Sequence, residues 1–386
     1  MSHPLDQHPY FTRWTDPQTE AVSYVLSERI APVMKAHYFQ TPSMKGDSKW
    51  LWFGALYPPS NAWQLGVVSL DPEDPQIRLI PGAHYTGNPW VDPAGDTICV
   101  PIDDGIYRFD VEGNWTELFR MPNDVRKNRY LYKLVTDLSV TADGKYFLLD
   151  SHIGNRWLLS LVDCRTGELT ELEWFHNAHI HCFASPVEET LFAVAQNHWI
   201  DPTTGEKNQM HVRLWFMDTV GTRYEPVFGD LWFGHNCMSC HEWFGPDGTF
   251  YWCDYQKGIY HCGTGPDRTR ELLWNRPSWH GQTDPSSGRY HVADIRPYTW
   301  DPCQVYFYDS DLQRDVAIAS ELPKPIVEGA NWRKWHMDPH PHFSQDGRYV
   351  IYTSSAPDGV LTAAVSPTDG LKQRVEAVGE DRSQPS

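Results

Sequence analysis

The chain has 386 residues and a formal net charge of −18, with 32 Lys and Arg against 50 Asp and Glu. Such an acidic chain is not expected to bind nucleic acid or an anionic membrane non-specifically, and an acidic ligand would need a local basic or metal site. The 18 Trp, 19 Tyr, 30 Pro and 27 Gly favour many short strands joined by tight turns. All-β is therefore the expected fold class.

No apolar run approaches the ~18 residues of a membrane-spanning helix, and the first twenty residues lack the apolar core of a secretory signal. We therefore expect a cytoplasmic protein without membrane contacts. The eight Cys have no framework spacing, which favours free thiols in a reducing compartment. The close pair Cys237 and Cys240 leaves a disulfide or a metal-bound pair open.

A hairpin signal recurs along the chain, in which a tight turn precedes an alternating apolar run. The seven copies begin at residues 43, 92, 141, 185, 245, 284 and 344. Their spacing of roughly 40 to 60 residues is typical of propeller blades. Each copy is followed by a third strand-like run, and most by a fourth, as in a four-stranded blade.

The two ends of the chain are expected to meet in one blade. The last copy lacks a fourth strand before the polar tail at 371–386, whereas residues 20–27, EAVSYVLS, form an unassigned strand-like run. Pairing of this run with the last blade would close the ring and leave no free sheet edge there. The prediction is a single domain over 1–386, a seven-bladed β-propeller with its blades at about 20–370.

Alignment of the seven copies on their turns places one polar residue of each at the start of the innermost strand, beside the central channel. These residues are Asn88, Asp137, His181, His241, His280 and His340, with Gln40 and the nearby His37 in the irregular first copy. Four His at equivalent positions are not expected of scattered core histidines. We therefore predict a polar ring at one mouth of the channel, with His181, His37 and His198 as candidates for substrate binding.

The segment before the last turn carries four polar residues at every second position. They are His336, Asp338, His340 and His342. An extended backbone would place all four on one face, and His280 would approach them from the adjacent blade. Imidazole and carboxylate groups in this arrangement suit a divalent metal with open positions for a substrate. Gln282 is a further candidate ligand, and a polar strand edge satisfied by backbone or water is the alternative.

Two more residues indicate acid–base chemistry on an anionic ligand. His241 faces the channel with no metal ligand beside it in the sequence, so its imidazole can act as a base, with His181 or His198 as alternatives. Arg213 interrupts the apolar strand pattern HVRLWFM. It is either a surface Arg lying over aromatic side chains or a clamp for a carboxylate.

The chain resembles the oligogalacturonate lyases, cytoplasmic seven-bladed propeller enzymes of pectin degradation. The resemblance spans nearly the whole chain and rests on the order and spacing of TEAVSYVLS, YFQTPSMKGDSKWLWFGA, VRLWFM, CHEWFGPDG, WHGQTDPSSG and PHPHFSQDG. It implies that Arg213 neutralises charge, that His241 abstracts a proton, and that three His and a Gln hold Mn²⁺. His280 and His340 match two of those His.

The sequence departs from that family at the other two ligand positions. In the ungapped match Asp338 replaces the third His and Trp335 replaces the Gln, although His336 or His342 could substitute after a small shift. The expected function is metal-assisted β-elimination from an acidic, uronate-containing oligosaccharide, which leaves a 4,5-unsaturated product. The alternatives are a lyase for a glucuronate-containing chain and a non-catalytic propeller that binds a ligand. Glycoside hydrolysis by paired carboxylates also stays open, through Asp137 and Asp338.

Overall fold

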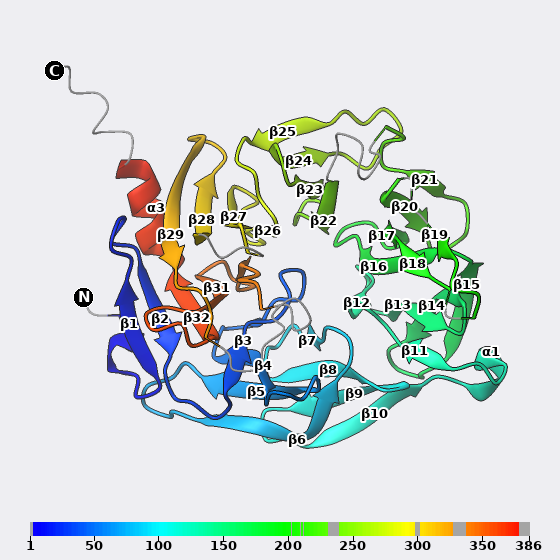
Figure 1. Cartoon of the computed structure of the whole chain (residues 1–386), viewed down its shortest axis with the longest axis horizontal. Helices are drawn as coiled ribbons and strands as arrows, with labels where there is room; N and C mark the ends of the chain where they lie inside the picture. Colours follow the sequence, from blue (N-terminus) through cyan, green and yellow to red (C-terminus); the bar gives the residue numbers. More distant parts are fainter. Residues whose placement is uncertain are drawn as a thin grey trace.

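The computed structural model describes residues 3–201, 203–208, 210, 212–230, 239–297, 302–326 and 337–377. Most of its strands form seven antiparallel sheets, the blades, which are arranged around a common centre, as Figure 1 shows. The predicted all-β, seven-bladed propeller is confirmed. None of the helices in the described part of the chain has the length and apolar character needed to cross a lipid bilayer.

The first four blades follow one another in chain order, with the first strand innermost, except that in blade three β11 and β12 both pair with the inner side of β13. Blade one contains β3 (Val33–Lys35), β4 (Trp50–Leu56), β5 (Trp63–Ser69) and β6 (Ile77–Tyr85). Blade two contains β7 (Trp90–Val91), β8 (Thr97–Ile102), β9 (Gly105–Asp110) and β10 (Trp115–Arg120). Blade three contains β11 (Leu131–Lys133), β12 (Ser139–Val140), β13 (Tyr146–Ile153), β14 (Arg156–Asp163) and β15 (Leu169–Phe175). Blade four contains β16 (Ala178–Ala184), β17 (Leu191–Asn197), β20 (Leu214–Asp218) and β21 (Tyr224–Pro226).

The remaining strands complete the ring. Blade five contains β22 (Ser239–Phe244), β23 (Phe250–Asp254), β24 (Gly258–Cys262) and β25 (Glu271–Trp274). Blade six contains β26 (Gly281–Thr283), β27 (Tyr290–Ile295), β28 (Cys303–Asp309) and β29 (Arg314–Leu322). Blade seven contains β30 (His342–Phe343), β31 (Tyr349–Ser354), β32 (Thr362–Pro367), β2 (Val22–Leu26) and β1 (Phe11–Thr15). The short elements are η1 (Pro4–Gln7), α1 (Asn123–Arg126), α3 (Thr368–Ala377) and the ribbon of β18 (Trp199–Ile200) and β19 (Lys207–Asn208).

The N-terminal segment closes the ring, as the sequence predicted. Strand β2 pairs with β32, with Val25 opposite Ala364, and the hydroxyls of Ser23 and Ser366 lie 2.5 Å apart across the junction. The closing element is a hairpin and not a single strand, because β1 pairs with the outer side of β2. The blades therefore begin at Phe11, earlier than expected.

The segment predicted as a polar tail from residue 371 begins instead as a helix. α3 runs to Ala377, and its Leu371 and Val375 are fully buried in the cluster between blades six and seven. A spacing of four residues places both side chains on one face of a helix, where they cover β28 and β29. The sequence reading missed this helix because only two apolar residues mark it.

The hydrophobic core is divided into layers between neighbouring blades. In one of them Val292 and Phe307 of blade six pack with Phe343 and Tyr352 of blade seven. Burial of such side chains contributes roughly 1.5–3 kcal/mol each. Because the apolar layers lie between the sheets, the inner strand ends are left to carry polar groups toward the common centre.

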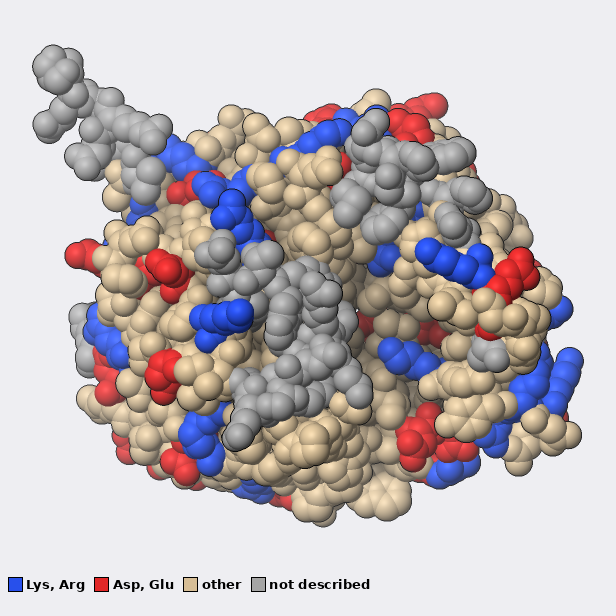
Figure 2. Space-filling model, in the orientation of Figure 1, with Lys and Arg blue, Asp and Glu red and all other residues tan. Residues whose placement is uncertain are grey.

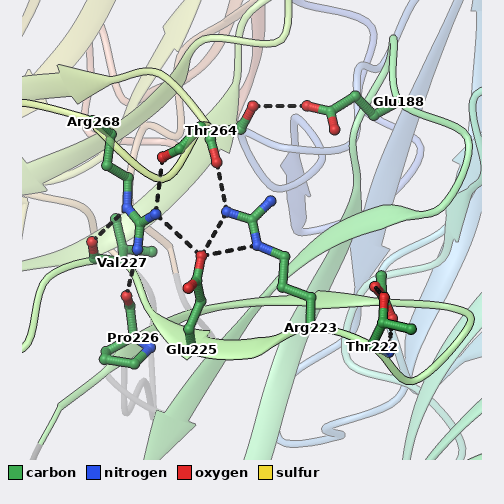
Figure 3. Close-up of polar contacts among 10 residues, drawn as sticks. Glu188, Thr222, Arg223, Glu225, Pro226, Val227, Thr264 and Arg268 are labelled. Atoms are coloured by element: carbon green, nitrogen blue, oxygen red, sulfur yellow. Dashed lines mark hydrogen bonds and ion pairs between the residues drawn. The ribbon is translucent and has the colours of Figure 1, made fainter.

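Polar contacts join blades four and five in addition to the apolar packing (Figure 3). The carboxylate of Glu225, on β21, accepts hydrogen bonds from Arg223 at 2.8 Å and from Arg268 at 3.1 Å. Arg223 also donates to the carbonyl of Thr264, at 2.5 Å. The outer strand of blade four is thus tied to the loop that precedes β25, which fixes the two blades against each other.

Seven of the eight Cys lie in the described part of the chain and are free thiols. Six of them are buried, and the partly buried one is Cys164. The predicted free thiols are confirmed for these seven residues. Cys237 lies outside the described residues.

Candidate functional site

The predicted polar ring surrounds the centre of the propeller. Its members Asn88, Asp137, His181, His241, His280 and His340 stand at or beside the first strands of blades two to seven. The side chains contact one another from blade to blade. Asn88 donates to Asp137 Oδ1 at 2.5 Å, and Asp137 Oδ2 lies 2.6 Å from His181 Nδ1. On the other side, the ring centroid of His280 lies 4.1 Å from that of His241 and 4.3 Å from that of His340.

Blade one supplies a residue that the sequence reading missed, Tyr38. Its ring, 7% exposed, packs against four ring histidines at centroid distances of 4.9 to 6.5 Å. The expected Gln40 instead binds the inner strand of blade five, where its amide donates to the backbone carbonyl of Glu242. The irregular turn of the first copy shifted the alignment by two residues. The available signal was the motif YFQ, which carries the resemblance.

Three ring histidines have a left-handed backbone. The φ angles are +53° at His181, +50° at His241 and +47° at His340. At the first two the register of the inner strand shifts by a β-bulge, which turns the side chain toward the centre. This conformation costs on the order of 1–3 kcal/mol for a residue with a Cβ, and strain of this kind clusters at functional sites.

The predicted extended face at 336–342 is wrong for the described residues. Only His342 and Phe343 are in a strand, and the positive φ of His340 breaks the alternation. His342 turns away from the ring, where its Nε2 accepts from the backbone N–H of Ser43 at 3.1 Å and its Nδ1 donates to the His340 carbonyl at 2.9 Å. Both ring nitrogens are used, so His342 is not a metal ligand.

Gln282 is also occupied by backbone groups. Its amide donates to the carbonyl of Phe39 at 2.7 Å, and its carbonyl accepts from the N–H of Phe343 at 2.6 Å. It therefore joins three segments and does not ligate a metal. The remaining candidate ligand, His336, and the neighbouring Trp335 lie outside the described residues.

Three of the predicted ligands do converge. The donor atoms of His280, Asp338 and His340 lie within 4.8 Å of one another, and all three residues are buried. Asp294, on β27, accepts from the backbone N–H of His280 at 2.9 Å, and its Oδ2 lies 2.8 Å from His280 Nδ1. A carboxylate on one imidazole nitrogen orients the other nitrogen and makes it a better metal ligand.

The cluster contains buried carboxyl groups, and Lys35 is a positive charge that acts on Asp338. Burial and the neighbouring Asp294 raise the pKa of Asp338 to about 8, and burial raises the pKa of Asp294 to about 7. Asp338 Oδ2 is buried and has no hydrogen-bond partner among the described residues. A divalent cation would offset this cost, and two imidazoles with a carboxylate are ligands that Mn²⁺ and related metals accept. The residues present therefore fit such an ion.

Asp294 lies on the second strand of its blade, whereas the repeats were aligned on the first strands, so its position was not predicted. The signal was nonetheless present, since the second strands YFLLD, FYWCD and YHVAD each end in Asp. In blade three the equivalent Asp150 accepts from the backbone N–H of Thr136 at 2.5 Å, as Asp294 does from that of His280. In blade six this Asp also contacts an imidazole, that of the ring member His280.

His241 has the geometry of a neutral base. Its Nδ1 donates to the backbone carbonyl of Trp279 at 2.6 Å, which leaves the lone pair on Nε2. Burial and the positive charge of Arg213 lower the pKa of His241 to about 4. The imidazole is therefore neutral at physiological pH.

Arg213 is a buried residue, so the reading as a surface Arg is wrong. It is 4% exposed, its Nε lies 3.8 Å from Glu242 Oε2, and its Nη1 donates to the Gln196 carbonyl at 3.4 Å. Glu242 follows His241 in the inner strand of blade five. A buried guanidinium is thus held next to the candidate base.

The three candidates for substrate binding have different positions. His181 is a ring member with an 18% exposed side chain. His198 lies between β17 and β18, and its Nδ1 accepts from the Met210 N–H at 3.2 Å. Burial and the charges of Lys207 and Arg213 lower the pKa of His198, and its role in substrate binding stays a prediction. His37 is 2% exposed and is not among the residues that line the cavity described next, so its role in substrate binding stays a prediction.

A cavity of about 460 Å³ opens beside Tyr38 and His181. Its lining comes from blades one to four and includes Asn88, Lys133 and Trp157. Figure 2 shows that this face of the molecule is hollowed beside its centre, toward blades three and four. The volume suits a small ligand such as one or two sugar units.

No protein-family model and no curated protein matches the chain. Among solved structures, it is similar to an oligogalacturonate lyase in complex with manganese, at 17% identity, a TM-score of 0.72 and coverage of 92% of this chain and 96% of that chain. An oligogalacturonate lyase from Vibrio parahaemolyticus matches at 14% identity with the same TM-score and coverage. The tricorn protease matches 94% of this chain over 37% of its own length, at 11% identity and a TM-score of 0.51. The chain therefore shares the seven-bladed propeller fold of the oligogalacturonate lyases.

Proposed function

We propose that the protein is a lyase that cleaves an acidic, uronate-containing oligosaccharide by metal-assisted β-elimination, with oligogalacturonate as its substrate. The observation that supports this most is the contact between a neutral His241 and the cluster of His280, Asp338 and His340, with Arg213 buried beside it. We place the activity in the cytoplasm as part of the same proposal, because the described thiols are free.

The reaction needs a base and a concentrated positive charge. The C5 proton of a uronate is α to a carboxylate, so its removal creates negative charge on the carboxylate oxygens. A divalent cation such as Mn²⁺, held by His280, Asp338 and His340, supplies charge stabilisation for that carboxylate when it is bound. Arg213 contributes a second positive charge beside the base.

His241 completes the arrangement. Its Nδ1 is fixed by the Trp279 carbonyl, so Nε2 is the atom that accepts the C5 proton. As the proton leaves, the C5–H electron pair forms the C4=C5 double bond and the bond from C4 to the glycosidic oxygen breaks. General-base action of this kind contributes roughly 10²–10⁴ in rate, and electrostatic stabilisation a comparable factor.

The test is incubation of the purified protein with galacturonate and glucuronate oligosaccharides, with Mn²⁺ and with chelator. The expected result is ultraviolet absorbance of the conjugated product from the galacturonate series, dependent on metal and lost in His241→Ala. Product from glucuronate oligosaccharides alone would move the proposal to a different uronide. No product from any uronide would favour a non-catalytic propeller that binds a ligand at its polar ring.

A further inference from the structure

The proton abstraction described above uses only one side of the polar ring. Blades two to four carry a second chain of contacts, from Asn88 through Asp137 to His181. Asp137 is fully buried. Its Oδ1 accepts from Asn88, and its Oδ2 contacts His181. Since His181 Nδ1 faces Asp137, Nε2 is the ring atom that can reach a ligand.

The backbone fixes this chain of side chains rigidly. Asn88 and Asp137 form a parallel bridge, with the Asn88 N–H donating to the Thr136 carbonyl at 2.8 Å and the Leu138 N–H donating to the Asn88 carbonyl at 3.0 Å. His181 itself has a φ of +53° at a β-bulge. A strained residue that is over-determined by its surroundings points to a function for its side chain.

His181 also has the right neighbours for the second half of the elimination. It occupies the ring position next to His241, one blade away, and Tyr38 packs against both imidazoles, with centroids 5.8 and 6.5 Å away. It lines the cavity of about 460 Å³, whose lining residues all come from blades one to four. Neither His280 nor His340 is among the described residues that line this cavity.

We propose that His181, held by Asp137, donates the proton to the glycosidic oxygen that leaves from C4, and that the cavity beside it receives the leaving sugar. This inference rests on the proposed function. His241 Nε2 takes the C5 proton, the C4–O bond breaks, and the electron pair on the departing oxygen takes the proton from His181 Nε2. His181 regains a proton from solvent and His241 loses one, so the cycle is balanced.

The protonation state of His181 agrees with this role. Burial opposes protonation, but the charge and hydrogen bond of Asp137 outweigh it and raise the pKa of His181 above its ordinary value. The buried Asp150 lines the same cavity, but its Oδ1 accepts from the Thr136 N–H at 2.5 Å and its Oδ2 is buried, whereas the side chain of His181 is 18% exposed. His181 is the better placed proton donor.

The test compares two leaving groups in the same enzyme. One substrate is the natural oligouronide, whose alkoxide needs a proton. The other is the matching 4-deoxy-4-fluoro uronide, whose fluoride leaves without one. For His181→Asn, which keeps an N–H toward Asp137, we expect kcat on the oligouronide to fall by roughly 10²–10⁴ and kcat on the fluoride to fall by less than about tenfold.

Asp137→Asn tests the positioning role of Asp137 and should show the same dependence on the leaving group with a smaller loss. His152→Asn is the matched control, because His152 lines the same cavity but stacks on Trp157 at a centroid distance of 3.9 Å. Its losses should be equal on both substrates. Circular dichroism and Mn²⁺ content identify any variant that fails to fold, and Asp137→Asn then carries the test.

Equal losses on both substrates for His181→Asn and Asp137→Asn would overturn the inference and leave His181 with a binding role. Unchanged kcat in both variants would overturn it as well. If the wild-type protein acts on neither substrate, the proposed lyase function itself is wrong. If the wild type cleaves both, only the role of His181 is decided by the variants.

Discussion

The two sides of the polar ring use the same residue type in two environments. His181 and His241 occupy equivalent positions of neighbouring blades, and both have a left-handed backbone. A carboxylate meets the imidazole of His181, whereas a backbone carbonyl and a buried Arg surround His241. The pKa of His181 is therefore raised, and that of His241 is lowered to about 4. The groups that contact each imidazole thus suffice to make one histidine a candidate proton donor and its neighbour a candidate proton acceptor.

Removal of the acceptor should have the largest effect. In His241→Ala we expect kcat to fall by roughly 10²–10⁴, with little change in KM, because the residue acts on the proton and not on substrate affinity. Mn²⁺ content should stay at the wild-type level. Steady-state kinetics and metal analysis check both statements, and near-normal kcat would move the role of base to His181 or His198.

The positive charge beside the acceptor is the next target. Arg213→Gln should lower kcat/KM by roughly 10²–10³, through weaker carboxylate binding and weaker charge stabilisation together. Arg223→Gln is the control, because Arg223 likewise pairs with a glutamate, Glu225, but lies at the outer edge of blade four. If Arg213→Gln had the same KM as the wild type, a direct role of Arg213 in binding the substrate carboxylate would be contradicted.

Metal affinity can also be lowered by changing a residue that positions a candidate ligand. Asp294→Asn should lower Mn²⁺ affinity by about 10–100-fold, since the residue orients His280, and His280→Ala should abolish binding. Titration calorimetry measures both. Asp309→Asn is the matched control, because Asp309 is a buried carboxylate that pairs with Arg289 on the outer part of blade six. Equal affinities in wild type and His280→Ala would show that the site is elsewhere.

The last prediction concerns the stability of the fold and not the activity, through a buried histidine outside the proposed site. His291 is buried, its Nδ1 lies 3.1 Å from the Thr283 hydroxyl, and burial lowers its pKa to about 3. Above pH 6.5 it is neutral in both states, and below that value the unfolded chain takes up a proton that the folded chain does not. This residue therefore costs about 1.4 kcal/mol of stability for each pH unit of acidification, down toward pH 3.

Urea unfolding between pH 6.5 and 4.5 measures this slope. His291→Gln should make it shallower, whatever its effect on stability at neutral pH. The exposed His176 is the control, and His176→Gln should leave the slope unchanged. If His291→Gln kept the wild-type slope of unfolding free energy against pH, other titratable groups would account for the loss of stability at acidic pH.

The turn spacing was enough to predict the propeller, its closure and six ring positions, because the strand that follows each turn has a fixed length. It was not enough at Tyr38, where the first turn is irregular. It also failed at His342, since the prediction assumed an extended backbone and the positive φ of His340 reverses the side chains after it. Asp294 was missed because contacts between first and second strands depend on pairing, which a repeat alignment does not show.

The hairpin of β1 and β2 has a consequence for the order in which the molecule is made. Six blades contain only strands that are near one another in the chain, so each can assemble as soon as its own segment has been synthesised. The seventh needs both ends, because β2 must wait for β32. His340 stands just before the inner strand of that last blade, so the cluster with His280 is completed only when the chain closes on itself. A nascent chain therefore carries the residues of the proposed base long before the candidate metal cluster is complete, and we expect the proposed activity to begin only with ring closure.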